Sequence, residues 1–314
     1  MEISMEQEAH STKNSAAIAE SCRDQVEKSA ASLAQSLGAV AVFVFGDLSL
    51  ENMPPQIPVI NISLHLKTVI EKLSFMKQDD PSHIREMAKN LTREAEGNTS
   101  MLQTAAAIEY ALGSINLGVV IGIVHFHESY SIVVHNMAES GTIRLLRECE
   151  KRVSPETLRS VLHLSLGIAT KGREGKKVGT AFIIGDEEEV MNRSHQMILN
   201  PYRSQDTEET NINRRDNWES VMGFSQLDGV FIVSATGKIL AAGRYLDVDT
   251  RDLSLEKGLG TRHLSSASIT RDTIAIAVIV SESGGTVRMY MDGKEVLFID
   301  PMQSVLEIDG EKMT

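Results

Sequence analysis

The first half of the chain alternates between helical and strand-like patterns of apolar residues. Apolar positions recur at helical spacing over residues 15–37, and Gly38 is expected to cap the end of that helix. Residues 39–46 form a continuous apolar run, which predicts a strand covered on both faces, as in a parallel sheet. A shorter segment at 59–62 predicts a second strand, followed by a helical pattern to about Met76. The alternation indicates an α/β domain.

Two more helices and two more strands complete this N-terminal region. Ser82 is expected to cap a helix that runs to about Glu96, and residues 97–99 interrupt the pattern before another helix at 101–111. The last two segments have strand character and cover residues 117–127 and 130–135. Residues 1–150 are therefore expected to form an α/β domain with a mainly parallel sheet. It contains no glycine-rich phosphate-binding loop, so a regulatory or oligomerisation role is favoured.

A new helix signal places the start of a second domain, residues 151–314, near residue 150. Ser154 is suited to cap this helix, Pro155 to begin it, and Glu156 to stabilise its first turn. The pattern after this helix predicts a strand at 178–185, a short helix at 195–200, a loop at 207–216, strands at 230–233 and 238–243, a helix at 264–269, and strands at 274–280 and 286–291.

Composition and charge restrict the class of function. A length of 314 residues suits two domains of ordinary size, and 42% hydrophobic with 24% charged residues is typical of a globular protein. The formal net charge of −12 argues against a protein that coats nucleic acid, since phosphate binding needs a basic surface. No secretory signal or membrane-spanning apolar stretch is present in the sequence, so we expect a cytoplasmic protein without a membrane partner.

Cysteine and histidine give weak signals. Cys22 and Cys149 are far apart in the sequence, which indicates neither a disulfide framework nor a structural zinc site and favours a reducing compartment. His125 and His127 would share one face of a strand, with His135 on a neighbouring strand. A metal site is one interpretation of these histidines. An exposed strand face is the favoured one, because no carboxylate or cysteine joins the group.

The last third of the chain contains residues that suit phosphate binding. Gly260 allows backbone N–H groups to approach phosphate oxygens, and Thr261 and Ser265 offer hydroxyl groups. Arg262 and His263 offer positive charge or charge-assisted hydrogen bonds. Taken alone, a Thr-Arg-His stretch is more often a surface turn, so the spacing by itself is a weak indication of a nucleotide site.

Two acidic residues in the same region suit a divalent metal. Asp228 and Glu282 each stand at the end of a predicted strand, and their carboxylates are hard oxygen ligands for Mg²⁺ or Mn²⁺. The Asp228-Gly229 pair has an alternative interpretation as an ordinary hairpin corner. Together with the phosphate-binding residues, the pair of carboxylates suits an anion-binding site with a metal, although each feature taken alone is a weak signal.

Several blocks in this half resemble the diadenylate cyclase family, the enzymes that make cyclic di-AMP. They occur in the family's order and at compatible distances across residues 155–300. The matching blocks are EGKKVGTAFIIGD at 174–186, HQMILNP at 195–201, Asp228-Gly229, LAAGRYL at 240–246, LGTRH at 259–263, and residues 280–282 followed by Gly284. The resemblance implies a C-terminal domain with a mixed central sheet flanked by helices.

The resemblance also implies roles for single residues. The family's Asp-Gly-Ala motif corresponds to Asp228-Gly229-Val230, where the aspartate would help to bind the metal and position the attacking ribose hydroxyl. Its Arg-His-Arg motif corresponds to Arg262-His263-Leu264, which with Thr261 and Ser265 would hold the triphosphate.

Further positions complete the implied site. The adenine would meet backbone groups at Leu246, and Ser281 and Glu282 lie where family members contact phosphate and metal. Two positions nearby depart from the family pattern, because Val230 replaces an alanine and Ser283 replaces a second glutamate.

The largest departure is Leu264, which stands in place of the second arginine of the motif. If that arginine faces phosphate in the transition state, its loss costs about 2 to 4 kcal/mol, by analogy with the loss of one electrostatic donor. Arg244, Arg271 and Lys257 are the nearby cations considered as substitutes.

Family membership would make the protein a metal-dependent enzyme with ATP as its substrate. It would condense two ATP into cyclic di-AMP and two pyrophosphates, using Mn²⁺ or Mg²⁺, and would produce a second messenger with roles such as osmoregulation. The symmetry of the reaction predicts a face-to-face homodimer of cyclase domains or a higher oligomer.

The domain order is similar to that of archaeal members, whose N-terminal domain is similar to the C-terminal domain of pyruvate kinase. The alternative is a catalytically silent sensor that binds a nucleotide or cyclic di-AMP.

Overall fold

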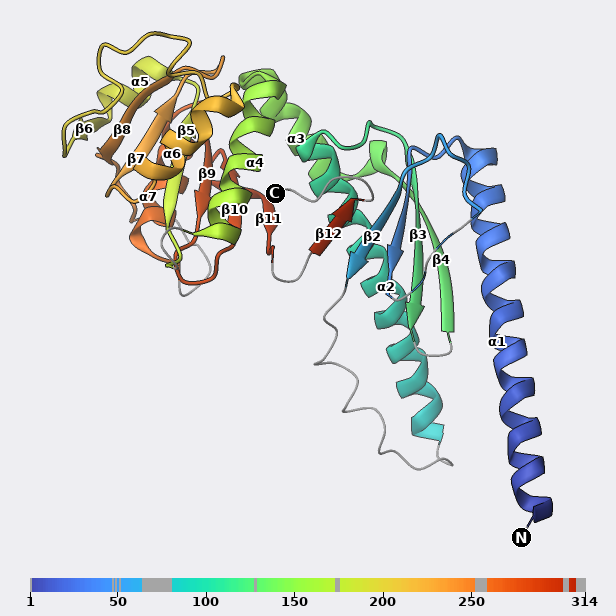
Figure 1. Ribbon diagram of the computed structural model, residues 1–314. Helices are drawn as coiled ribbons and strands as arrows, with labels where there is room; N and C mark the ends of the chain where they lie inside the picture. Colours follow the sequence, from blue (N-terminus) through green and yellow to red (C-terminus); the bar gives the residue numbers. More distant parts are fainter. Residues whose placement is uncertain are drawn as a thin grey trace. The chain divides into compact units, whose positions relative to one another are not determined.

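The chain forms two compact units. The computed structural model describes residues 2–46, 48, 50, 52–63, 81–126, 129–172, 176–251, 259–301 and 305–308 (Figure 1). Unit 1 comprises Met1–Ala106, Ile115–Ala138 and Gln303–Thr314, and unit 2 comprises Ala107–Ser114 and Glu139–Met302. The domain boundary near residue 150 stays a prediction. The helix predicted to run to about Met76 lies outside the described residues.

Unit 1 contains a five-stranded sheet with the order β12-β2-β1-β3-β4. At its centre, β1 pairs in parallel with both β2 and β3, whereas the edge strands β4 and β12 pair antiparallel. The five strands are β1 (Ala41–Phe45), β2 (Val59–Ser63), β3 (Val119–Phe126), β4 (Ser129–Asn136) and β12 (Val305–Ile308). Every side chain of β1 is buried, as a continuous apolar run predicts for a central strand.

Helices cover both faces of this sheet. Ala30 and Ala34 of α1 (Glu2–Leu37) pack in one cluster with Ile121 of β3. A Cβ on Gly122 would lie 3.1 Å from Leu102 of α2 (Pro81–Leu112), and neighbouring positions of a strand point to opposite faces. The α/β class predicted for this region is therefore confirmed.

The predicted end of α1 is confirmed, whereas the predicted break within α2 is wrong. Gly38 follows the last residue of α1 with a φ of +59°, as expected for a helix cap. The prediction of two helices separated at residues 97–99 is wrong, because α2 runs through them. A glycine inside a helix costs only about 1 kcal/mol, and burial of Leu102 and Ala106 just after it offsets that cost.

Unit 2 is built on a seven-stranded mixed sheet, as predicted. Its strand order is β11-β10-β9-β5-β7-β8-β6, and only the β5–β7 pair is parallel. The strands are β5 (Thr180–Ile184), β6 (Ser194–Gln196), β7 (Val230–Val233), β8 (Ile239–Leu246), β9 (Ile276–Val280), β10 (Val287–Met291) and β11 (Lys294–Ile299).

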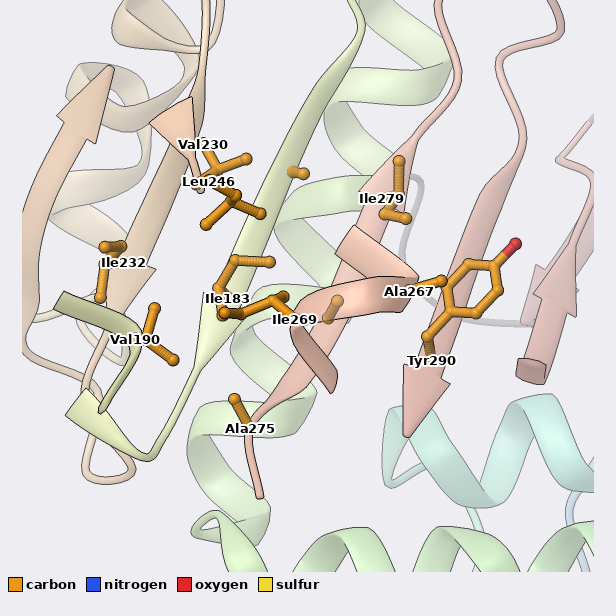
Figure 2. Packing of buried hydrophobic residues seen from close by; sticks show 12 residues of the cluster. Ile183, Val190, Val230, Ile232, Leu246, Ala267, Ile269, Ala275, Ile279 and Tyr290 are labelled. Carbon is orange, nitrogen blue, oxygen red and sulfur yellow. The ribbon is translucent and has the colours of Figure 1, made fainter. Parts of the chain in front are cut away.

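Helices flank this second sheet. Ser154 caps the start of α4 by accepting a hydrogen bond from the Thr157 backbone N–H, which confirms the predicted signal. On one face, Ala267 and Ile269 of α7 pack into a buried cluster with Ile183 of β5, which Figure 2 shows from close by. The helices are α3 (Gly141–Arg152), α4 (Pro155–Lys171), α5 (Glu187–Asn192), α6 (Trp218–Phe224) and α7 (Thr261–Asp272), with single turns η1 (Met137–Glu139) and η2 (Arg215–Asn217).

One predicted helix of this unit is a strand. The short helix expected at 195–200 is wrong, since Ser194, His195 and Gln196 form β6 and pair with β8. Side chains hold this segment on β8, because Gln196 Nε2 donates to the Ala242 carbonyl at 2.6 Å and Asn200 Nδ2 donates to that of Leu240 at 2.9 Å. These contacts favour an extended chain over a short isolated helix.

Candidate functional site

Strand register brings the predicted residues to one edge of the unit 2 sheet. β5 and β7 are parallel with Phe182 opposite Phe231, so Gly179 and Asp228 precede these strands at the same level. β9 is antiparallel to β5, with Val280 opposite Thr180, so the residues after β9 lie at that same edge. Neighbouring strands are about 4.8 Å apart. Asp228, Gly179 and Glu282 thus meet at three adjacent strand ends, although about 50 residues separate each from the next in sequence.

Gly179 makes room for the arginine of α7 at this edge. A Cβ on Gly179 would lie 2.8 Å from Arg262 Nη1 and 2.9 Å from Glu282 Cβ. Because no side chain occupies that position, the Arg262 guanidinium and Glu282 can both pack against the backbone before β5. Gly179 was not predicted as a site residue, although it belongs to one of the blocks that carry the family resemblance.

The first turn of α7 presents backbone donors. The Gly260 carbonyl accepts hydrogen bonds from His263 N–H at 3.0 Å and Leu264 N–H at 3.3 Å, which begins the helix. Gly260 has no side chain to cap the first amides of α7, and uncapped amides at a helix N-terminus suit an anion. Thr261 is exposed, whereas the Ser265 hydroxyl is half-buried and donates to the Arg262 carbonyl at 3.2 Å.

His263 differs from its neighbours because its side chain is buried. Burial, followed by the positive charges of Arg288 and Arg262, lowers the pKa of His263 to about 4. At neutral pH its imidazole is uncharged and can donate or accept a hydrogen bond. The fixed positive charge of the Thr-Arg-His stretch is therefore that of Arg262.

The end of β8 reaches the same edge. β7 and β8 are antiparallel, with Val230 opposite Arg244. Leu246, two residues after Arg244, therefore lies at the same level as Asp228, two residues before Val230. Gly229 has a φ of +101°, and a Cβ there would lie only 2.6 Å from the Arg244 carbonyl oxygen. The Asp228-Gly229 turn therefore packs closely on β8. The Leu246 side chain joins the buried cluster shown in Figure 2, which leaves its backbone as the part able to meet a base.

Two of the three cations expected to replace the missing arginine, Arg244 and Arg271, make contacts of their own. Arg244 is buried and donates to Ser194 Oγ and to the Met191 carbonyl, both at 2.9 Å. Arg271 forms an ion pair with Asp272 at 2.7 Å. Lys257 lies outside the described residues.

Asp228 and Glu282 fit a metal that is shared with a nucleotide. Both side chains are exposed at the sheet edge. Within the described ranges, no group of three or more His, Cys, Asp or Glu side chains is arranged to hold a metal ion alone. Mg²⁺ is commonly held by one or two carboxylates together with substrate phosphates and water, and two carboxylates beside an anion-binding helix end fit that pattern.

The histidines of unit 1 are spread along its sheet. His125 stacks on Tyr130 with ring centroids 4.5 Å apart. His135 pairs with Val120, five residues along β3 from His125. His127 lies outside the described residues. The two described histidines are therefore separated along the sheet, and both are half-buried rather than exposed.

Comparisons with known proteins assign the C-terminal region to a family. The family described as DisA bacterial checkpoint controller nucleotide-binding matches residues 167–295. A curated diadenylate cyclase of Methanocaldococcus jannaschii is 42% identical over 164 residues, which cover 52% of this chain and 50% of that protein. Residues 167–295 are thus similar to a nucleotide-binding family, and this half of the chain is similar to a curated diadenylate cyclase. A diadenylate cyclase of Haloferax volcanii is 41% identical to the chain over 152 residues, covering 48% of this chain and 55% of that protein.

The N-terminal region has a family match of its own. Residues 26–138 match the family described as "Probable sensor domain DacZ_A". The likeness of this region to a pyruvate kinase domain stays a prediction. The chain spans about half the length of the curated relatives it matches. Among solved structures, DacA from Staphylococcus aureus is 25% identical with a TM-score of 0.33, covering 44% of this chain and 82% of that chain.

In the part of the chain that the structure describes, no helix combines the length and apolar character required to cross a bilayer.

Proposed function

We propose that this protein is a diadenylate cyclase that converts two ATP into cyclic di-AMP and two pyrophosphates. The observation that carries the proposal is the meeting of Asp228, Arg262 and Glu282 at one edge of a sheet in a domain of this family. Glu282 lies close to the Arg262 guanidinium at Gly179, and Asp228 lies at the end of the next strand but one, an arrangement that suits a metal-bound triphosphate.

In the proposed reaction, the 3′-hydroxyl of each ATP attacks the α-phosphorus of the other. A new P–O bond forms at each α-phosphorus while the bond to pyrophosphate breaks, and the hydroxyl proton leaves to a carboxylate or to water. Asp228 orients the attacking hydroxyl, and Arg262 stabilises charge on the phosphates. A bound Mn²⁺ or Mg²⁺ ion supplies further neutralisation of phosphate charge.

The proposal includes a homo-oligomer. One cyclase domain that holds one ATP provides half of the reacting groups, so a two-fold pair of domains completes the reaction. Unit 1, which matches a sensor family, is proposed to regulate or arrange that pairing. A cytoplasmic location and a second-messenger role in osmoregulation belong to the same proposal, as does the choice between Mn²⁺ and Mg²⁺.

A product assay tests the proposal. Purified protein is incubated with ATP and Mn²⁺, and in parallel with Mg²⁺, and the products are identified by mass spectrometry. We expect cyclic di-AMP and pyrophosphate. The silent-sensor alternative, motivated by Leu264, predicts bound nucleotide without pyrophosphate release.

The Asp228→Asn variant tests the site within that assay. Loss of the carboxylate charge is expected to lower the rate by about 100-fold or more, because metal binding and hydroxyl positioning both weaken. Full activity of this variant would contradict the assignment of Asp228.

A further inference from the structure

The segment before β5 makes a contact that lies outside the Asp-Gly-Val motif at 228–230 and the Arg-His-Leu motif at 262–264. Lys177 is exposed, and its Nζ donates a hydrogen bond to the Gly284 carbonyl at 3.3 Å. Gly284 belongs to the β9–β10 loop, residues 281–286, which also contains Glu282. This loop therefore carries one of the two proposed metal ligands, and Lys177 is tied to its far end.

The β9–β10 loop is closed by its own backbone. Ser281 N–H donates to the Thr286 carbonyl at 2.9 Å, and Gly285 N–H donates to the Ser281 carbonyl at 2.9 Å. These bonds fix the ends of the loop on β9 and β10. Glu282 and Ser283 lie between them, exposed to solvent. The orientation of Glu282 relative to the sheet edge thus depends on what holds the loop from outside.

Two elements hold the loop at Gly285. A Cβ at that position would lie 3.2 Å from the Ala169 carbonyl oxygen, in the last turn of α4, and 3.5 Å from Lys177 Nζ. An ammonium group near the C-terminal end of a helix is stabilised by the partial negative charge of the last carbonyls. Lys177 therefore lies where both the Gly284 carbonyl and the end of α4 favour its charge.

The other side of the loop meets the candidate site. Glu282 Cβ and Arg262 Nη1 would lie 2.9 Å and 2.8 Å from a Cβ on Gly179, two residues after Lys177. The segment 177–179 consequently contacts the loop at two points, through the lysine side chain at Gly284 and through the glycine backbone at Glu282.

We propose that Lys177 is a positioning residue, which holds the β9–β10 loop against the start of β5 and the end of α4 and thereby fixes Glu282 beside Arg262. The inference rests on the proposed cyclase function. Lys177 acts through the loop, so its removal should change both the rate and the concentration of metal needed, since Glu282 is a proposed metal ligand.

The test compares the full-length wild type with Lys177→Met, Lys177→Arg and Lys176→Met. Methionine keeps much of the length of lysine without its charge, and arginine keeps a charged donor. Lys176 is an exposed neighbour and serves as the matched control. The rate of cyclic di-AMP formation at saturating ATP is measured as a function of Mn²⁺ concentration, and thermal unfolding is followed on each protein.

For Lys177→Met we expect a kcat about tenfold lower and a half-saturating Mn²⁺ concentration about fivefold higher, as loss of one charged hydrogen bond acting on a ligand suggests. Lys177→Arg should stay within about threefold and Lys176→Met within about twofold of wild type in both quantities. Wild-type rate and Mn²⁺ dependence in Lys177→Met would overturn the inference, as would a lower kcat with unchanged Mn²⁺ dependence.

The test of Lys177 still gives an answer if Lys177→Met is less stable or if the wild type is inactive. If Lys177→Met unfolds at a lower temperature, Lys177→Arg decides, because failure of this variant to restore the Mn²⁺ dependence overturns the role. If the wild type makes no cyclic di-AMP with either metal, the proposed function fails on its own. The four proteins are then compared by calorimetry of Mn²⁺-dependent ATP binding, in which a raised Mn²⁺ requirement in Lys177→Met alone supports the inference and equal requirements reject it.

Discussion

Gly179 is a residue at which a single added carbon should disturb the candidate site. An alanine Cβ would lie 2.8 Å from Arg262 Nη1 and 3.1 Å from the Glu282 backbone nitrogen. The guanidinium can move aside, but the Glu282 backbone belongs to a closed loop. We expect Gly179→Ala to lower kcat by about 10- to 100-fold, since a shift of about 1 Å in a catalytic group has effects of that size.

The assay of Gly179→Ala needs a glycine that has space around it. Gly167 lies within α4, and nothing is found within 4 Å of its Cβ position. Gly167→Ala should therefore keep wild-type activity. Equal activity of the two variants would show that the close packing at Gly179 has no bearing on the reaction.

His263 gives a prediction about stability and pH. Its folded pKa of about 4 lies below the ordinary value near 6.5, so between these values the unfolded chain binds a proton that the folded chain does not. Stability should therefore rise with pH through this window, and this residue alone should contribute about 2 kcal/mol between pH 5 and pH 7.

The measurement is the free energy of unfolding in urea at several pH values for wild type and His263→Gln. Subtracting the two profiles isolates His263 from groups such as Glu109, whose pKa is raised by burial, and His163, whose pKa is lowered by burial. Profiles that run parallel from pH 5 to pH 7 would mean that His263 does not carry this dependence.

At the residue scale, the sequence identified candidate residues whose own side chains carry a charge that suits a metal or a phosphate. Asp228, Arg262 and Glu282 stood out because carboxylates and a guanidinium suit a metal and phosphates. Gly179 and Lys177 did not stand out, since their significance arises from contacts with residues 83 to 107 positions away. The neutrality of His263 likewise depends on burial and on Arg288, which no local motif reveals.

Among the elements, α2 offers a direct test of its continuity. Gly97 is exposed inside this helix, and its Cβ position has nothing within 4 Å. Gly97→Ala should raise the free energy of unfolding by about 0.5 to 1 kcal/mol, because alanine loses less backbone entropy in a helix. Chemical denaturation of the full chain measures this change.

Gly38 provides the opposite control for that substitution. Its Cβ position is also open, but its φ is +59°. Gly38→Ala should lower the free energy of unfolding by about 1 kcal/mol, the usual penalty for a side chain in the left-handed region. A helix that is interrupted at 97–99 would show no gain in Gly97→Ala.

The elements that could be predicted have local signals. The continuous apolar run of β1 and the Ser154 cap of α4 are readable from a few neighbouring residues. The predicted break in α2 and the predicted helix at 195–200 were wrong because packing of Leu102 in the first case, and side-chain hydrogen bonds to β8 in the second, override local preference. Strand β11 was missed, and its burial does not alternate regularly.

For the molecule as a whole, the proposed pairing of domains predicts a dependence on protein concentration. At saturating ATP and Mn²⁺, the rate per chain should fall when the protein is diluted enough to separate the pairs, because each single domain holds one of the two nucleotides. Mass photometry over the same dilution range follows the oligomer. A monomeric preparation whose rate per chain is independent of concentration would contradict the pairing.

The division of the chain into two units was only partly readable from sequence. Length and the helix signal at Ser154 indicate two domains. They do not reveal that residues 107–114 group with unit 2 or that β12 completes the sheet of unit 1. Such assignments depend on pairing between distant parts of the chain, and hydrophobic periodicity carries no information about which strands become partners.

The order in which the strands join the unit 2 sheet has a consequence during synthesis. β5, β7 and β9 are neighbours in the sheet, but β9 is made last, and Glu282 follows it directly. A nascent chain that still lacks β9 has an unpaired edge on β5 and lacks Glu282, the second carboxylate at the sheet edge. Under the proposed function, a ribosome-bound chain would consume no ATP until residue 282 has emerged, so premature release of the messenger is prevented by topology alone.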